Sequence, residues 1–438
     1  MIKSIRLLSI TSLIVLFFNF FNFFLIGKFY KLEEFFEFSV LTSFAFIFVK
    51  IFSFGWREKI IIDSSSMNKK NNIIFLNLII SFMAVIFFSI TLFIYIFFSD
   101  NNFEFLNIII IDLTIIFLIL NPILNSFLEK NENFKKISNM RIMRSLVMIT
   151  IFSLFLYLDQ KKYALFLSLI FSELFIFLLL IKYLDFSFKN ITFNFSNQIK
   201  HVKLYFLRSN LNKTVYIQQL ISSITDNFII IFFGFFGVFN ISSGYSFFQK
   251  MNGIINSIIS YPIKTVSFPN ISKKYSLKDI KTIFEGIVFW QIIVLFPIIL
   301  IFIFYLKLFI DFIGFQECII SVQILSILYI GRLVSLFLGP FPEIFYNLNI
   351  GGFYNKLLVF RFVSLCIFSI VYLISEINNI LFLFLPILLI NLTINLILIF
   401  NVYRILNVNI YSIIKKRLNL FIYIIMLSIL IIQFRLLI

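Results

Sequence analysis

Residues 73–98 read IIFLNLIISFMAVIFFSITLFIYIFF, a stretch that contains no Asp, Glu, Lys or Arg. A helix needs roughly 17–25 mostly apolar residues to cross the hydrocarbon layer of a membrane, which is about 30 Å thick. Similar runs recur along all 438 residues, so that apolar residues make up 61% of the chain and its mean hydropathy is +1.05. Lipid offers no partner to exposed backbone N–H and C=O groups, so each crossing run must be helical. The sequence therefore predicts an all-α polytopic membrane protein.

The apolar runs are separated by short polar stretches, and their spacing predicts thirteen membrane spans. The predicted spans are 8–26, 36–54, 73–98, 105–128, 144–158, 163–181, 214–236, 243–262, 283–305, 318–340, 357–375, 378–400 and 418–434. The fifth run is short and the tenth contains an arginine, which makes these two the least regular. Residues 1–26 are basic and then apolar, and we interpret them as a retained first span because no small-residue cleavage motif follows.

Basic residues gather in alternate loops. The chain has 37 Lys and Arg against 20 Asp and Glu, a formal net charge of +17. If the N-terminus is cytoplasmic, most of the loop Lys and Arg fall on the cytoplasmic side, as the positive-inside rule requires. The basic excess is thus explained by membrane topology, and no nucleic-acid partner is expected. The chain is therefore predicted to cross its membrane many times, with a cytoplasmic N-terminus.

The long basic loop near the middle of the chain divides it into two sets of six spans. We predict an N-terminal six-helix half (1–185), a cytoplasmic linker (186–213), a C-terminal six-helix half (214–403) and a basic segment with an extra C-terminal helix (404–438). Two six-helix bundles that form a central cleft are typical of transporters built from repeats. A weak internal sequence repeat supports this division. Gly27 and Gly234 are each predicted to turn the chain between two helices, and an aromatic-Ser pair begins eleven residues after each glycine.

Motifs for catalysis and metal binding are missing from the sequence. The two cysteines, Cys318 and Cys366, form no Cys/His cluster, and the only histidine, His201, lies in a basic loop. No phosphate-binding glycine loop, nucleophile elbow or zinc-binding histidine pair occurs. We therefore expect no cofactor, no metal and no hydrolysis of ATP by this chain.

The candidate functional groups are charged residues inside the predicted spans, because a charge at mid-membrane costs about 2.5–3.5 kcal/mol, together with arginines where spans meet the inner loops. The candidates for binding a substrate anion are the cations Arg332, Lys250, Arg57, Arg144 and Arg208, and the candidates for ion coupling or charge pairing are Asp226, Glu173 and Asp112. Two interpretations stay open. These groups line a shared wet cavity, or they pair with one another inside the bundle, as Asp226 would with Arg332. The arginines near the inner loops either gather an anionic head group by paired hydrogen bonds or serve only to set topology.

Two segments carry a resemblance to a known family. LIGKFYKLEEFFEFSVLTSFAFIF (25–48) and SSITDNFIIIFFGFFGVFNISSGYSFFQKMNGIINSIISYPIKTVSFPNISKKY (222–275) resemble hairpins of bacterial polysaccharide flippases, the O-antigen transporter branch of the multidrug/oligosaccharidyl-lipid/polysaccharide flippase superfamily. The matching elements are Gly27-Lys28, Leu32-Glu33-Glu34, Asp226, Gly234, Gly244-Tyr245-Ser246 and Phe268-Pro269…Ser272. A Gly that usually follows the acidic pair is replaced by Phe36-Glu37, and the thirteenth run exceeds the usual twelve spans.

The resemblance implies a flippase for a polyprenyl-diphosphate-linked oligosaccharide used in O-antigen, lipopolysaccharide or other surface polysaccharide assembly. Its expected partners are the lipid bilayer, this lipid-linked substrate and a polysaccharide polymerase. In this interpretation the cations hold the diphosphate while a carboxylate neutralises them or carries a coupling proton. One alternative is a cation-coupled multidrug exporter of the same superfamily. Another is a membrane-embedded polysaccharide polymerase or ligase, which the short predicted outer loops disfavour.

Overall fold

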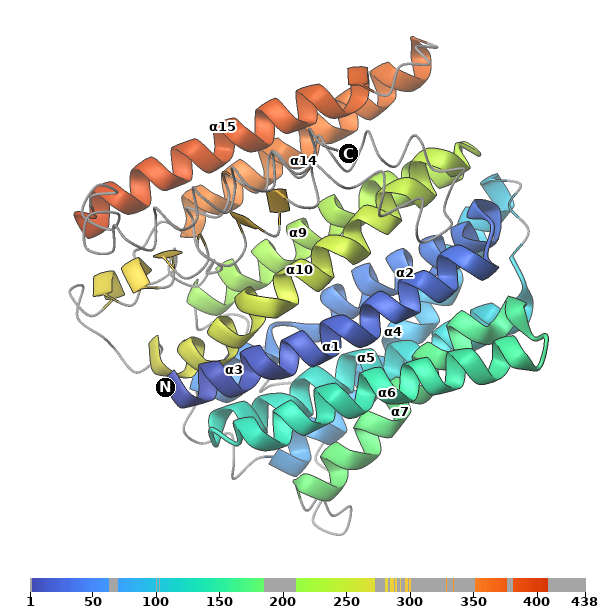
Figure 1. The fold of residues 1–438 in the computed structure, drawn as a ribbon. Coiled ribbons are helices and arrows are strands. Elements are labelled where there is room, and N and C mark those ends of the chain that lie inside the picture. The colour runs from blue at the N-terminus through green and yellow to red at the C-terminus, as the bar shows by residue number, and fades with distance from the viewer. Residues whose placement is uncertain are drawn as a thin grey trace, which may run out of the picture. The chain divides into compact units, whose positions relative to one another are not determined.

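The computed structural model describes residues 2–62, 70–99, 101, 103–184, 210–271, 351–375 and 381–408, with short pieces between 280 and 300 and the single residues 328 and 334. Every regular element in these ranges is an α-helix (Figure 1). The helices are α1 (Ile2–Phe29), α2 (Leu32–Ser53), α3 (Trp56–Ile62), α4 (Lys70–Ser99), α5 (Phe105–Lys130), α6 (Phe134–Tyr157), α7 (Lys161–Tyr183), α9 (Asn210–Phe235), α10 (Phe239–Ile271), α14 (Gly351–Ile374) and α15 (Leu381–Leu406).

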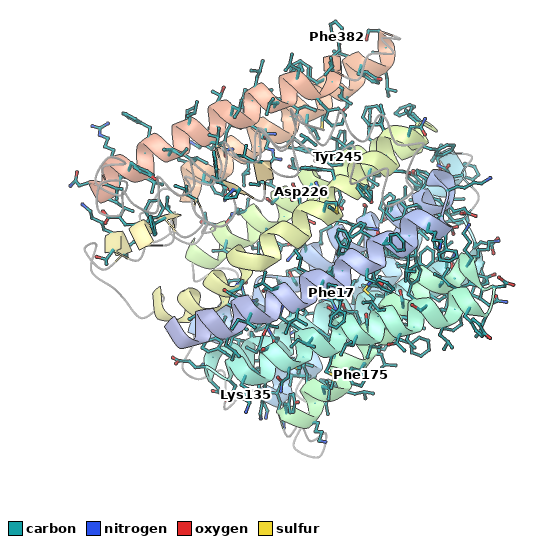
Figure 2. All side chains as sticks on the ribbon, viewed as in Figure 1. Phe17, Lys135, Phe175, Asp226, Tyr245 and Phe382 are labelled. Carbon is teal, nitrogen blue, oxygen red and sulfur yellow. The ribbon has the colours of Figure 1, made fainter. Side chains whose placement is uncertain are left out.

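Nine helices in this described part are long and apolar enough to cross a membrane, namely α1, α2, α4, α5, α6, α7, α9, α14 and α15. Each corresponds to one predicted span, so the predicted all-α polytopic membrane fold is confirmed. Large apolar side chains remain exposed along these helices, as Phe17 on α1 and Phe93 on α4 do. Figure 2 shows Phe17 among the side chains that project from α1. A lipid-facing surface is the ordinary place for such side chains in a membrane protein.

The predicted spans differ from the helices mainly at their ends. The fifth span was predicted as 144–158, but α6 begins ten residues earlier at Phe134. Its first turns contain Lys135, Lys136 and Arg141, which lie before the predicted run. Arg141 and Arg144 both find partners on neighbouring helices. Gly27 was predicted to turn the chain, but it lies inside α1, which continues to Phe29. The chain turns instead at Tyr30 and Lys31.

The chain divides into two compact units, Met1–Ser243 and Gly244–Ile438. In the first unit, α5 is the central helix and packs against α2, α3, α4 and α7, while α6 packs against α1 and α7. The face of α5 that is buried bears Ile111, Ile115, Leu124 and Phe127. In the second unit, α14 packs against α15, and the rings of Tyr245 on α10 and Phe384 on α15 stack with centroids 6.1 Å apart.

Helix α9 belongs to the first unit and packs against α2. A Cβ added to Gly234 would lie 2.9 Å from Phe36 Cε2, 3.0 Å from Tyr95 Oη and 3.1 Å from Val40 Cγ2. Glycine therefore lets α9 approach α2 and α4 closely at this point. The chain leaves α9 through Gly237, whose φ of 71° is the left-handed conformation that glycine adopts without strain.

Several predictions fall outside the described residues. The span 418–434 lies there, as does 318–340 apart from the single residues 328 and 334, and so do most of 283–305 and most of the linker 186–213. The proposed four-part division of the chain, the central cleft and the extra C-terminal helix all stay predictions.

Charged groups within the helices as a candidate transport site

Six of the eight predicted site residues lie on described helices. Arg57 is on α3, Asp112 on α5, Arg144 on α6, Glu173 on α7, Asp226 on α9 and Lys250 on α10. Arg208 and Arg332 lie outside the described residues. The predicted pairing of Asp226 with Arg332 is therefore also outside them.

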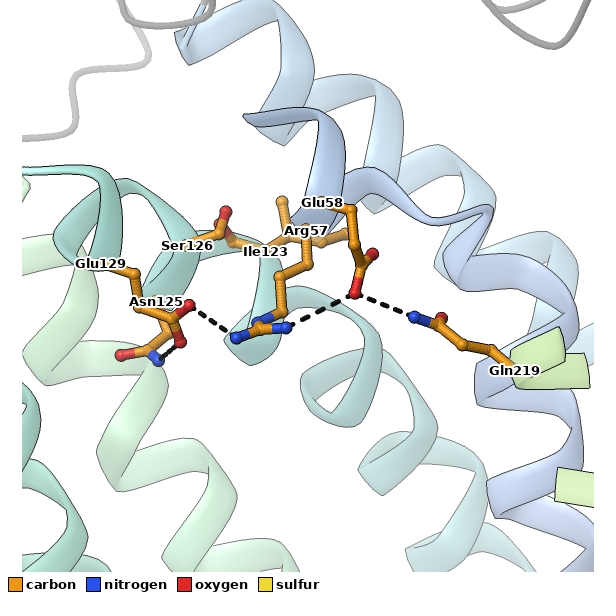
Figure 3. Close-up of polar contacts among 7 residues, drawn as sticks. All are labelled: Arg57, Glu58, Ile123, Asn125, Ser126, Glu129 and Gln219. Carbon is orange, nitrogen blue, oxygen red and sulfur yellow. Dashed lines mark hydrogen bonds and ion pairs between the residues drawn. The ribbon is translucent and has the colours of Figure 1, made fainter. Parts of the chain in front are cut away.

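Arg57 lies in a network of polar contacts at the end of the first unit where α3 meets α5 and α9 (Figure 3). Its Nη2 donates a hydrogen bond of 2.8 Å to Glu129 Oε2 at the end of α5, and its Nη1 lies 3.4 Å from Glu58 Oε1 on α3. Gln219 on α9 donates from Nε2 to the same Glu58 oxygen at 2.8 Å. Asn125 on α5 donates from Nδ2 to Glu129 Oε1 at 2.9 Å.

Both carboxylates of this network are buried, Glu58 at 3% and Glu129 at 1% exposure. Arg57 supplies the positive charge that buried carboxylates need. Its side chain is 20% exposed, and the guanidinium is already shared between two acceptors inside the unit. The network thus joins α3, α5 and α9 into one assembly. Whether Arg57 also contacts a substrate stays a prediction.

Arg144, Glu173 and Asn121 form a second cluster, deeper between α5, α6 and α7. Arg144 Nη2 forms an ion pair with Glu173 Oε1. Asn121 Nδ2 donates to Glu173 Oε2 at 2.7 Å and to the Glu173 backbone oxygen at 3.0 Å. The Glu173 side chain is 4% exposed, whereas that of Arg144 is 47% exposed. One predicted anion-binding cation and one predicted coupling carboxylate are therefore direct partners.

The depth of this second cluster follows from helix geometry. Arg144 comes ten residues after the first residue of α6, and Glu173 comes ten before the last residue of α7. Asn121 comes nine before the last residue of α5. At 1.5 Å per residue, all three lie about 14–15 Å from the same end of their helices.

Two further polar contacts cross between helices within the first unit. Asp112 on α5 accepts hydrogen bonds from the Ser89 hydroxyl on α4, at 3.0 Å to Oδ1 and 3.2 Å to Oδ2. Arg141 on α6 donates from Nη1 to the Ser12 hydroxyl on α1 at 2.9 Å. A serine hydroxyl is a neutral partner, so neither of these two contacts supplies a counter-ion.

The opposite end of the first unit carries a network that sequence reasoning missed. Glu34 pairs with Lys161 at 2.6 Å and accepts a hydrogen bond of 2.8 Å from the backbone N–H of Lys31. These contacts place Glu34 in the first turn of α2, where a carboxylate offsets the positive end of the helix dipole. The pair Glu33-Glu34 thus begins a helix, and its acidic-pair pattern was the signal available in the sequence.

The same network extends over the α4–α5 and α6–α7 connections. Lys162 pairs with Glu104, and Glu37 accepts hydrogen bonds from the Glu104 backbone N–H at 2.9 Å and from Asn107 Nδ2 at 3.0 Å. The Tyr30 hydroxyl donates to the backbone oxygen of Lys161, and burial raises the pKa of the Tyr30 phenol. These contacts tie together three connections at one end of the unit.

Asp226 and Lys250 lie on α9 and α10. Asp226 is half-buried near the middle of α9, and Figure 2 labels it. The Lys250 Nζ is buried. The residue before it, Gln249, donates from Nε2 to the Tyr245 hydroxyl at 3.1 Å. Among the described residues, no group of three or more His, Cys, Asp or Glu is arranged to hold a metal ion.

Comparisons with models of protein families and with curated protein sequences give no match for this chain. Solved structures do match over almost the whole length. The multidrug transporter DinF-BH of the MATE family, in complex with R6G, has a TM-score of 0.61 and 13% identity, covering 93% of this chain and 97% of that chain. The chain has the fold of this transporter.

Two further structures show the same fold in different states. An inward-facing multidrug resistance MATE family transporter of the MOP superfamily has a TM-score of 0.58 and 13% identity, covering 93% of this chain and 99% of that chain. An outward-facing multidrug resistance MATE family transporter of the MOP superfamily has a TM-score of 0.53 and 16% identity, covering 94% of this chain and 96% of that chain. The fold expected from the resemblance is thus confirmed, while the O-antigen branch stays a prediction.

Proposed function

We propose that this chain is a flippase that moves a polyprenyl-diphosphate-linked oligosaccharide from the cytoplasmic to the outer leaflet of a bacterial inner membrane. Transport proceeds by alternating access, with the N-terminus cytoplasmic and no catalytic step in this chain. The fold supports the transport part of this proposal, because similar folds are described in both inward-facing and outward-facing states. The flipped lipid then becomes substrate for a polysaccharide polymerase, the partner that this function requires.

The substrate presents a clear physical problem. A sugar chain and a diphosphate lose their hydration on entering hydrocarbon, and an isolated buried charge is penalised heavily. The transporter must offer cationic hydrogen-bond donors at depth in the membrane while the prenyl tail stays in lipid. Guanidinium suits this task because its planar fork binds phosphate oxygens with paired hydrogen bonds.

Arg144 is the observation that carries the proposal. Its side chain is 47% exposed although it lies about 15 Å from the end of α6. A charged group at this depth is costly unless it meets water or an anion. Glu173 supplies one anion inside the unit, and the exposed part of the Arg144 side chain can in addition meet a phosphate that comes from outside the unit.

Export of a cationic drug is the second candidate function. DinF-BH is described as a multidrug transporter in complex with R6G, and half-buried Asp226 and Asp112 are acidic groups within helices of this chain. A MOP superfamily transporter from Pyrococcus furiosus has a TM-score of 0.51 and 16% identity, covering 93% of this chain and 97% of that chain. It is described as having a binding pocket of reverse polarity that suggests a different function. Charge in the pocket is thus the property that distinguishes the two candidates.

A two-substrate transport assay tests the proposal. Purified protein is reconstituted into vesicles that hold either a fluorescent polyprenyl-diphosphate sugar or rhodamine 6G, a cationic dye. We expect transfer of the lipid-linked sugar between leaflets, reduced at least tenfold by Arg144→Gln and unchanged by Lys135→Gln. Lys135 is exposed near the start of α6, so this control removes the same charge from outside the cluster. Dye transport without sugar transfer would favour the drug exporter and refute the flippase.

A further inference from the structure

The Arg144–Glu173 pair has one partner facing inward and one facing outward. Glu173 is enclosed between α5, α6 and α7, held by two hydrogen bonds from the Asn121 amide and by the ion pair with Arg144. Arg144 lies on the exposed side of α6 beside Met143 and Leu146, which are exposed as well. An anion that approaches this surface therefore meets Arg144 first and has no direct access to Glu173.

An anion and Glu173 compete for the same guanidinium. Arg presents five N–H donors in a fixed plane, and bidentate binding of a phosphate uses the edge that offers two parallel donors. Such binding turns the guanidinium toward the phosphate and takes it away from the carboxylate. Glu173 would then be a buried carboxylate without its counter-ion, which is strongly unfavourable. Proton uptake removes that penalty, because a neutral carboxylic acid keeps its acceptor oxygen for Asn121.

We propose that Arg144 is the binding site for a phosphate-bearing lipid headgroup, and that this headgroup displaces Glu173, which takes up one proton from water as it is displaced. The proton comes from hydronium in the solvent, whose O–H bond breaks to leave water, and it adds to the carboxylate to give the neutral acid. Binding of the anion and protonation of Glu173 are thus linked, and each favours the other. The identity of the headgroup as the diphosphate of a lipid-linked sugar rests on the proposed function, whereas the exchange itself requires only a phosphate.

No other described ionisable group has a shown contact with Glu173. Helix α7 packs against α2, α5 and α6. On these helices three other ionisable groups form hydrogen bonds with residues other than Glu173. Glu37 accepts from Asn107 and from the Glu104 backbone, Asp112 accepts from Ser89, and Arg141 donates to Ser12. Arg144 is therefore the group whose loss or redirection changes the charge balance around Glu173.

The linkage fixes the direction of the pH dependence. If one proton is taken up for each anion bound, anion affinity rises as pH falls, by up to tenfold per pH unit. The probe must not titrate in the same range. A phosphodiester or diphosphate diester satisfies this condition, because it lacks the second ionisation near pH 6 that a phosphate monoester has.

Calorimetric titration of the full-length protein in neutral-lipid nanodiscs tests the exchange. The probes are a short-chain prenyl diphosphosugar and, separately, dihexanoylphosphatidylglycerol, each in two buffers of different ionisation enthalpy. We expect uptake of about one proton per probe bound at neutral pH and tighter binding at lower pH. Uptake with the diphosphosugar identifies the lipid-linked sugar as the source of the phosphate. Uptake with the phosphatidylglycerol alone identifies a membrane lipid.

Matched variants separate the two partners of the pair. Glu173→Gln keeps an acceptor for Asn121 but cannot titrate, so we expect probe binding that is independent of pH and accompanied by no proton uptake. Arg144→Gln should weaken binding at least tenfold, and Arg144→Lys should recover part of the loss because the charge returns without the planar fork. Lys135→Gln should leave both affinity and proton uptake unchanged. Equal elution volume on size exclusion identifies variants that have kept their fold.

The outcomes of the inference and of the proposed function can be told apart. Wild-type binding of either probe without proton uptake, or a Glu173→Gln variant that keeps the pH dependence, would overturn the exchange even if sugar transfer is observed in vesicles. Proton-linked binding in a protein that fails to transfer lipid-linked sugar would support the exchange and refute the flippase.

Discussion

Arg57→Gln is the substitution whose effect follows most directly from the structure. It removes a cation that contacts both Glu58 and Glu129, which are 3% and 1% exposed. Loss of one partner from a buried ion pair costs about 3–5 kcal/mol, because the remaining charge is left uncompensated. Arg57 makes one short contact of 2.8 Å and one long contact of 3.4 Å, and water reaches 20% of its side chain. We therefore expect a loss near the lower end, about 3 kcal/mol.

Unfolding in detergent micelles titrated with dodecyl sulfate measures this loss. Trp56 precedes Arg57 on α3 and is buried, so its fluorescence reports the unfolding of this region. The measurement is made in a Trp290→Phe background, which leaves Trp56 as the only tryptophan. Lys135→Gln is the matched control, because it removes an equal charge from an exposed position on α6. In the double variant Arg57→Gln/Glu129→Gln, part of the stability should return, since one uncompensated carboxylate is gone. A loss below about 1 kcal/mol for Arg57→Gln, the size typical of an exposed pair, would refute the reasoning.

Three further predictions use the same unfolding measurement. Gly234→Ala should destabilise the protein by about 1–3 kcal/mol, because the added methyl meets Phe36, Tyr95 and Val40 at 2.9–3.1 Å. The control is Gly253→Ala, whose added methyl meets nothing within 4 Å. Equal losses of stability in the two variants would argue against close packing of α9. Phe88→Ala should lower the free energy of unfolding by about 3–5 kcal/mol, since the Phe88 side chain is fully buried. Phe93→Ala, on the exposed face of α4, should lower it much less. A larger loss for Phe93→Ala than for Phe88→Ala would contradict the packing described. Lys161→Gln should lower the free energy of unfolding by under about 1 kcal/mol, because the paired side chains of Lys161 and Glu34 are 36% and 44% exposed. A larger loss would mean that this end of the unit is held more rigidly than its exposure indicates.

Each of the nine described helices that are long and apolar enough to cross a membrane corresponds to a predicted span, because hydropathy acts over a whole span. The predicted span 243–262 falls on α10, which is not among these nine. Helix ends were predicted less well where charge and packing compete. The start of α6 was placed too late because Lys135, Lys136 and Arg141 look unfavourable in a membrane, although Ser12 lies beside Arg141 in the structure. Gly27 was assigned to a turn on residue type alone, whereas the helix continues through it to Phe29.

The candidate site could be predicted by residue type but not by pairing. Glu173 was selected as a charge in an apolar run and Arg144 as an arginine where a helix meets an inner loop, yet their contact joins residues 29 positions apart and depends on how α6 and α7 pack. Glu58, Glu129 and Gln219 were missed because each lies near a predicted span end, where a polar residue is unremarkable. Their burial arises only when α3, α5 and α9 come together. Single-sequence patterns hold no information about such contacts between distant helices.

Transfer of the lipid-linked sugar between leaflets tests the central claim most directly. Vesicles are prepared with a labelled polyprenyl-diphosphate sugar in both leaflets, and the sugar that an added membrane-impermeant glycosidase can cleave is followed over time. Without protein, about half of the label should remain protected, because the polar head cannot cross hydrocarbon. With the wild-type chain we predict that the protected half becomes cleavable, and that Arg144→Gln slows this step at least tenfold. A protected fraction that stays at about half in the presence of folded wild-type protein would contradict the account.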